Sequence, residues 1–172
     1  MRKLKILYVT QYFTGEHGAT TNRAVANIRH FVQQGHDVTV IAEMPNHPKG
    51  IIAKPYRGKL IVKEKAVGAS VIRVWVYTKP EKTQITRILF YVSFMFMGVI
   101  AALLNWKKFD VVYVTSPPLL VGGIGVALKF LFPYTRFVFE VRDLWPKTAI
   151  ELGMLSNPQV ISISRKLEML CY

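Results

Sequence analysis

The segment from Lys5 to Ala42 places the strongest constraint on the fold of this chain. It begins with a continuous apolar run in Lys5–Thr10, which is typical of a strand covered on both faces. Between Asn22 and Gln34 the apolar residues recur at helical spacing, and Asp37–Ala42 is a second strand rich in β-branched residues. A strand, a helix and a strand of this length form a right-handed βαβ unit, so we expect a parallel sheet.

The loop at 11–20 falls where open parallel sheets bind ligands, outside the carboxyl end of a strand. Thr20 or Thr21 is available as the N-cap of the helix that follows. Because Gly18 has no side chain, a phosphate is able to approach the backbone at Gly18 and Ala19. The alternative is that the glycines of this loop only shape a turn. Their spacing does not match the dinucleotide fingerprint.

The rest of the chain continues the alternation of strands and helices. Gly68 lies between two strand patterns and predicts a hairpin or a strand pair at the sheet edge. The glycines of the later apolar helix indicate close packing on the sheet rather than a nucleotide loop. The predicted fold is an α/β, Rossmann-like open parallel sheet with helices on both faces. The further expected strands are Lys59–Lys65, Ser70–Tyr77, Asp110–Thr115 and Arg136–Val141, and the further expected helices are Leu119–Phe132 and Gln159–Leu170.

One segment, Ile88–Leu104, carries no charged residue and is bracketed by Arg87 and by Trp106-Lys107-Lys108. It falls just short of the about 20 residues that a membrane-spanning helix needs. A span would place the two halves of one sheet on opposite sides of a membrane, and a fully buried helix would hide more aromatic side chains than one sheet face covers. We therefore predict a monotopic helix that packs one side on the domain and inserts the other into a leaflet, with a buried helix as the alternative.

The composition narrows the range of partners. The chain has 172 residues, with 23 basic and 10 acidic side chains and a net charge of +13, which suits one domain with an anionic partner. Nucleic acid is not expected, because the basic residues are scattered and form no recognisable module. Cys171 excludes a disulfide framework, and the absence of an apolar stretch after Met1 predicts no signal peptide. His47 lacks metal ligands at suitable spacing and is interpreted as a surface histidine.

Polar residues follow the strands predicted at 110–115 and 136–141. Arg142 and Asp143 stand at the end of an apolar strand, where a charged pair costs desolvation energy unless it is used. The alternative is that the two form an ion pair that caps the strand. Because carboxyl ends of parallel strands share one edge, we expect the loops of Gly18, Ser116 and Asp143 to meet in one crevice.

Four motifs in order carry a resemblance to a known family. These are the opening segment 5–50, the strand end VIRVWVY, the strand end VYVTSPPL and the strand end FEVRDLWP. They resemble bacterial retaining glycosyltransferases of family 4, in particular the branch that adds N-acetylated amino-sugars such as fucosamine to lipid-linked surface polysaccharides. The resemblance implies the N-terminal, acceptor-side half of a GT-B enzyme. It implies transfer from a nucleoside-diphosphate sugar, which is a substrate, with no metal and no other cofactor.

The resemblance also implies roles for individual residues. Gly18 and Ala19 match the loop that approaches the donor diphosphate. Asp143 matches the position that faces the reacting carbon or the acceptor hydroxyl, with Arg142 beside it. Residues implied for the acceptor side are Glu16, His17, Thr115, Ser116 and Trp145.

The remaining expectations concern location and partners. The family's apolar helix docks on the membrane that holds a polyprenyl-diphosphate-linked glycan acceptor, which predicts a cytoplasmic protein, peripheral or monotopic on the inner face of the plasma membrane. The family's C-terminal donor domain is not in residues 1–172, so we expect it on a longer chain or a partner chain, and we expect this chain alone to bind donor weakly without turnover. Two alternatives stay open: a non-catalytic, membrane-docked partner subunit of a separate glycosyltransferase, and a nicotinamide-binding Rossmann protein.

Overall fold

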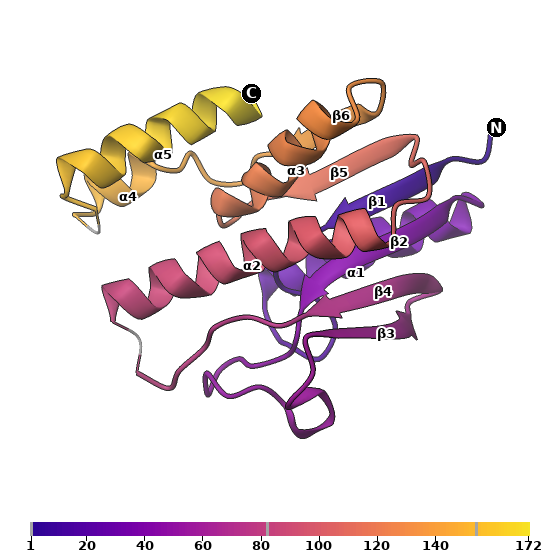
Figure 1. Ribbon diagram of the computed structural model, residues 1–172, viewed down its shortest axis with the longest axis horizontal. Helices are drawn as coiled ribbons and strands as arrows, with labels where there is room; N and C mark the ends of the chain where they lie inside the picture. The colour runs from indigo at the N-terminus through magenta and orange to yellow at the C-terminus, as the bar shows by residue number, and fades with distance from the viewer. Residues whose placement is uncertain (1, 82, 154) are drawn as a thin grey trace.

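A computed structural model describes residues 2–81, 83–153 and 155–172. Its centre is a six-stranded sheet in the order β3-β4-β2-β1-β5-β6, shown in Figure 1. The strands are β1 (Lys5–Val9), β2 (Asp37–Glu43), β3 (Ile61–Ala66), β4 (Ala69–Val74), β5 (Val111–Thr115) and β6 (Arg136–Glu140). The helices are α1 (Ala19–Gln33), the short 3₁₀ turn Lys54–Tyr56, α2 (Gln84–Leu104), α3 (Leu120–Leu131), α4 (Lys147–Glu151) and α5 (Pro158–Cys171).

The central strand β1 pairs in parallel with β2 on one side and with β5 on the other. Its apolar residues are at most 3% exposed, which explains why the sequence shows an unbroken hydrophobic run instead of an alternating one. Strands β4 and β6 extend the sheet in parallel, so the predicted open parallel sheet is confirmed. The predicted edge hairpin is also confirmed, since β3 runs antiparallel to β4.

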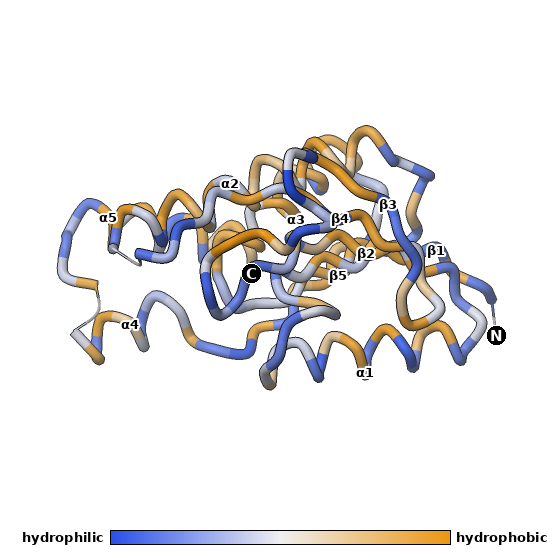
Figure 2. Tube along the Cα trace, turned by 90° about the horizontal axis from the view of Figure 1, so that it is seen from below, coloured by the Kyte–Doolittle hydropathy of each residue, from blue (hydrophilic) through white to orange (hydrophobic). Residues whose placement is uncertain are grey.

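Helices cover both faces of the sheet, as predicted. Helix α1 lies on one face, and α2, α3 and α5 lie side by side on the other (Figures 1 and 2). Three glycines let α3 pack closely within this layer, because a Cβ at Gly122 would lie 2.5 Å from the Cys171 Sγ and one at Gly123 would lie 2.6 Å from the Met95 Sδ. A Cβ at Gly125 would collide with the Phe137 ring. These contacts confirm that the glycines of α3 serve packing.

Helix α2 begins four residues before the predicted apolar segment, at Gln84. The Oγ1 of its N-cap, Thr83, accepts a hydrogen bond from the Thr86 N–H at 3.2 Å. Among the helices of the described residues, α2 is the one that is long and apolar enough to cross a membrane. It instead packs along β2, β4 and α3. Only one side of the helix is buried, so the alternative of a fully buried helix is wrong; the buried residues are Phe94, Gly98, Ala101 and Ala102.

A buried arginine ties the edge of the sheet to the loop after β1. Arg73 on β4 is 2% exposed. Its Nε donates to Glu64 Oε1 on β3 at 2.8 Å, its Nη1 donates to the Glu43 carbonyl at 3.2 Å, and its Nη2 donates to the Thr14 carbonyl at 2.6 Å. The guanidinium also lies 5.5 Å from the centre of the Phe13 ring. One side chain thus joins β3, β2 and the β1–α1 loop.

We predict that Arg73→Ala lowers the free energy of unfolding by about 3 kcal/mol, because it leaves buried carbonyl groups and the Glu64 carboxylate without a partner. Urea denaturation followed by circular dichroism measures this loss. Arg136→Ala is the matched control, since Arg136 is exposed on β6, and we expect a change within about 0.5 kcal/mol. Equal effects of the two substitutions would contradict the assigned role of Arg73.

Candidate active site at the carboxyl edge

The first turn of α1 presents free backbone N–H groups. The N-cap is Gly18, with φ 146° and ψ 167°, and no side chain caps the helix. The predicted cap at Thr20 or Thr21 is therefore wrong, because the helix already begins at Ala19. A Cβ placed on Gly18 would meet no atom within 4 Å, so the approach to these N–H groups is open. With no acidic residue in the first turn, the helix end favours an anion.

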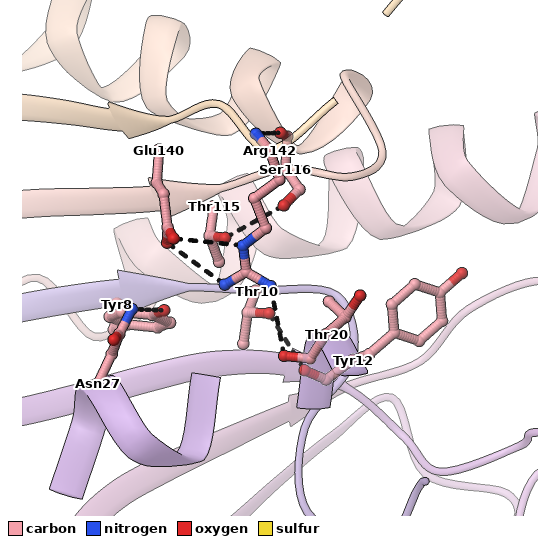
Figure 3. Close-up of polar contacts among 9 residues, drawn as sticks. All are labelled: Tyr8, Thr10, Tyr12, Thr20, Asn27, Thr115, Ser116, Glu140 and Arg142. Atoms are coloured by element: carbon pink, nitrogen blue, oxygen red, sulfur yellow. Dashed lines mark hydrogen bonds and ion pairs between the residues drawn. The ribbon is translucent and has the colours of Figure 1, made fainter. Parts of the chain in front are cut away.

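Arg142 connects the three loops that were expected to meet (Figure 3). Its Nη1 donates to the carbonyl of Thr20 in α1 at 3.4 Å, and its backbone N–H donates to Ser116 Oγ after β5 at 3.1 Å. Its side chain forms an ion pair with Glu140 at 3.3 Å and is 8% exposed. These contacts confirm that the first turn of α1, the end of β5 and the segment after β6 come together, whereas a single crevice shared by Gly18, Ser116 and Asp143 stays a prediction. The interpretation of Arg142 and Asp143 as an ion pair is wrong, because the carboxylate that pairs with Arg142 is Glu140.

Thr115 and Ser116 are buried at the end of β5, with exposed fractions of 1% and 4%. The Thr115 hydroxyl donates to the Ser116 carbonyl at 3.2 Å, and the Ser116 N–H donates to the Glu140 carbonyl at 3.0 Å. The Ser116 N–H bond therefore ties the end of β5 to β6, while the Thr115 hydroxyl bonds only within its own segment. Their implied contact with an acceptor stays a prediction.

Asp143 is exposed and forms no side-chain hydrogen bond in the described part of the chain. It lies beside a small hollow that is also lined by Ser116, Trp145 and Tyr172. Of the three acidic residues Glu16, Glu140 and Asp143, only Asp143 is exposed to solvent. It directly follows Arg142 in the chain, and the Arg142 N–H contacts Ser116. This exposure leaves it available to a ligand.

Glu16 lies on the other side of the β1 end, and His17 is exposed. Glu16 is 6% exposed, and its Oε1 accepts the backbone N–H groups of Asn46 at 2.9 Å and His47 at 3.1 Å. The side chain thus holds the loop after β2 against the loop after β1. In this structure Glu16 positions two loops and does not face the space beside Asp143.

A buried acidic residue that the sequence analysis did not single out supports this arrangement. Burial and the neighbouring Glu16 raise the pKa of Glu43 well above its ordinary value. Its two oxygens accept hydrogen bonds from Gln11 Nε2 at 2.8 Å and from Asn46 Nδ2 at 2.9 Å. The only sequence signal was that the carboxylate follows directly on the apolar strand DVTVIA. This network explains how the ends of β1 and β2 keep a fixed geometry.

No group of three possible metal ligands gathers within residues 2–81, 83–153 and 155–172. His47 is exposed on the loop after β2, as the sequence suggested. The expectation that the chemistry needs no metal stays a prediction.

The fold and this edge define a class of protein. An open α/β sheet with helices on both faces, whose polar loops meet at the carboxyl ends of its parallel strands, is the arrangement of a GT-B N-terminal domain. The family model described as "Glycosyl transferase 4-like domain" matches residues 18–168. The chain therefore belongs to this family and is a glycosyltransferase domain.

A solved structure supports the fold. The chain is similar to the catalytic domain of starch synthase IV from Arabidopsis thaliana bound to ADP and acarbose, with a TM-score of 0.61 over 83% of this chain. The sequence identity is 11%, so this likeness concerns the fold alone, and the match spans 34% of the length of that chain. No curated protein matches the chain at a significant level.

We predict that Arg142 and Glu140 are energetically coupled by about 1 kcal/mol, since their side chains are mostly buried and their contact is bidentate. A double-mutant cycle with Arg142→Gln, Glu140→Gln and the double variant measures the coupling by urea denaturation. The same cycle for the exposed pair Lys147 and Glu151, 3.9 Å apart, is the control and is expected to give a smaller value. Additive effects at Arg142 and Glu140 would show that the contact does not organise this edge.

Proposed function

We propose that this chain is the acceptor-side, N-terminal domain of a GT-B glycosyltransferase of the family 4 type. The enzyme transfers a sugar, in the predicted branch an N-acetylated amino-sugar, from a nucleoside-diphosphate sugar to a lipid-linked surface-polysaccharide acceptor, with retention of configuration. The observation that carries the proposal is the junction made by Arg142, which brings the open start of α1, the end of β5 and Asp143 to one edge of a glycosyltransferase domain. The ADP bound to the starch synthase relative supports a nucleotide-linked donor.

In this proposal the N–H groups of Gly18 and Ala19 approach the donor diphosphate, whose charge they stabilise as the sugar leaves. The Asp143 carboxylate accepts a hydrogen bond from a sugar hydroxyl beside the reacting carbon. Arg142 is held by Glu140 and Thr20, and its backbone N–H bond to Ser116 fixes the start of the segment that carries Asp143. His17, Ser116, Thr115 and Trp145 line the acceptor side, and Glu16 holds the loop that carries His17.

The remaining donor contacts come from a second domain, on a longer chain or on a partner chain. This chain spans about a third of the starch synthase chain that it matches, 34% by length. A cation that neutralises the leaving diphosphate from the opposite side belongs to that domain in the proposal.

We propose further that α2 docks the domain on the cytoplasmic face of the plasma membrane. Its outward side carries a stripe of exposed apolar residues: Ile85, Ile88, Leu89, Phe96, Ile100, Leu103 and Leu104. Lys107 and Lys108 follow the helix, and the chain has a net charge of +13. An apolar stripe with cations beside it is suited to a leaflet with anionic headgroups.

The second candidate is a membrane-docked partner subunit without catalytic residues of its own. The exposed stripe of α2 supports it equally, because docking alone explains the stripe. The two candidates differ at Asp143, which only the enzyme requires.

We predict that Asp143→Asn lowers sugar transfer by about 100-fold or more when the chain works together with its donor domain, because the amide cannot replace the carboxylate at the reacting centre. Transfer of radiolabelled sugar to a lipid-linked acceptor measures the rate. Glu151→Gln on α4, an exposed carboxylate outside this edge, is the control and should retain the wild-type rate. If Asp143→Asn also retained the wild-type rate, the catalytic role of Asp143 would be rejected and the partner-subunit candidate would be favoured.

We predict that Phe96→Asn weakens binding to vesicles of phosphatidylethanolamine and phosphatidylglycerol by about fivefold. Phe96 is 60% exposed, so its side chain is able to enter the leaflet, and the substitution removes this apolar contact. Vesicle sedimentation measures the bound fraction. Leu152→Asn is the matched control: Leu152 is 67% exposed but follows α4, which lies away from α2 in Figure 2. A similar loss for both variants would contradict docking through α2.

A further inference from the structure

A second cavity at the carboxyl edge lies apart from the Arg142 junction. It has a volume of about 230 Å³ and opens between the ends of β1, β2 and β4 and the beginning of α2. None of the residues implied by the family resemblance lines it. The lining residues are Tyr12, Asn46, His47, Thr78, Lys79, Thr86, Arg87, Phe90 and Tyr91.

The cavity is lined by basic side chains without a carboxylate. Lys79 comes from the segment after β4, Arg87 from the first turns of α2, and His47 from the loop after β2, whereas Asp and Glu do not occur in the lining. Within the described residues, neither Lys79 nor Arg87 forms an ion pair. The carboxyl groups of Glu16 and Glu43 lie behind the wall, where they accept hydrogen bonds from Asn46 and His47. Lys79 and Arg87 are exposed at the open side of the cavity, where two cations close together attract an anion.

The walls of the cavity are fixed by hydrogen bonds. The Tyr77 N–H donates to Ser93 Oγ on α2 at 2.8 Å, and Thr78 Oγ1 donates to Asn46 Oδ1 at 3.3 Å. Burial and the nearby Glu43 raise the pKa of Tyr12, so its phenol keeps its proton and is able to donate a hydrogen bond. The cavity is therefore preformed, which lowers the entropic cost of binding a ligand.

The position of the cavity on α2 indicates where the anion comes from. Thr86, Arg87 and Phe90 line the cavity, while the neighbouring Ile88 and Leu89 belong to the exposed apolar stripe. A phosphate in the cavity is thus within one helical turn of the side chains proposed to enter the leaflet. That arrangement suits a phosphate carried by a lipid rather than a free one.

We propose that this cavity binds the phosphate groups of a membrane lipid and, given the proposed function, holds the diphosphate of the polyprenyl-linked acceptor. Lys79 and Arg87 contact the phosphate oxygens, and the lipid chain leaves along the apolar stripe of α2. The donor diphosphate is proposed to bind at Gly18, which does not line this cavity, so the two diphosphates are assigned to different sites.

The test compares vesicles of phosphatidylcholine that contain either polyprenyl diphosphate or phosphatidylglycerol at equal surface charge. We expect the wild-type chain to prefer the polyprenyl diphosphate vesicles. The Lys79→Gln/Arg87→Gln variant should lose this preference by about tenfold or more, since each substitution removes a charge-assisted contact. Lys63→Gln/Lys65→Gln on the exposed side of β3 removes the same charge elsewhere and should keep the preference.

Three outcomes would overturn the proposal: equal wild-type binding to both vesicle types, an equal loss in the two double variants, and retention of the preference by Lys79→Gln/Arg87→Gln. Calorimetry with inorganic diphosphate distinguishes a lipid site from a site for a free anion. If inorganic diphosphate bound with the same affinity as the polyprenyl diphosphate, the cavity would be a site for a free anion.

Binding is measured without sugar transfer, so the outcome separates this proposal from the proposed function. Loss of transfer in Asp143→Asn with an intact vesicle preference supports both proposals. If the wild-type chain transferred sugar but showed no preference for polyprenyl diphosphate vesicles, the cavity would be rejected as the acceptor site. The assignment as a glycosyltransferase would remain. An intact preference with wild-type transfer in Asp143→Asn rejects the catalytic role alone.

Discussion

The pairing of β1 with parallel strands on both sides determines where chemistry is possible in this domain. Because β1, β2, β4, β5 and β6 run in the same direction, their loops leave at one edge and bring together segments far apart in the sequence. Burial continues past the end of β1 into Thr10 and Gln11, both with no exposed surface. Polar groups in such a place require partners: the Thr10 hydroxyl donates to the Tyr12 carbonyl and Gln11 Nε2 donates to the Glu43 carboxyl, whereas Gln11 Oε1 has no partner within the described residues. The geometry of this edge is therefore set by groups that belong to the core.

Two networks share the task of holding this edge, one on each side of β1. On the β2 side, Glu43, Gln11, Asn46 and Glu16 join the first two loops, and Arg73 reaches the same region from β4. On the β5 side, Arg142 joins α1, β5 and β6. Apolar residues at these positions would cost less desolvation. What the polar groups provide is direction, because a hydrogen bond fixes a loop at one angle and apolar packing tolerates several.

The sequence predicted the fold because the dominant signals are local. Continuous apolar runs identified the parallel strands, Gly68 marked the hairpin, and the glycines of α3 were correctly interpreted as packing residues. Helix α4 escaped prediction because five residues with little periodicity resemble a loop. The pairing of Arg142 with Glu140 was readable in principle, since residues two apart on a strand share a face. The Glu16–Asn46 contact and the cavity beside Arg87 were not, because they depend on which loops meet after the sheet has formed.

The form of α2 explains why the helix looked ambiguous in the sequence. Apart from Phe94, its buried side consists of Gly98, Ala101 and Ala102, and a Cβ at Gly98 would collide with Ile124 of α3. Small residues let the helix backbone lie close to the layer beneath it, while Phe96, Ile100 and Leu104 project outward. A helix designed only for a water-soluble core has the reverse distribution, with its large apolar residues inward. Placing bulk on the outer side leaves apolar area in water, which is unfavourable until a second apolar medium covers it. The same helix therefore packs on the core with Phe94 and its small residues, and with Phe90, Met95 and Met97 beside them, while its outer side leaves apolar area in solvent. In the proposed docking, a lipid leaflet covers this outer area.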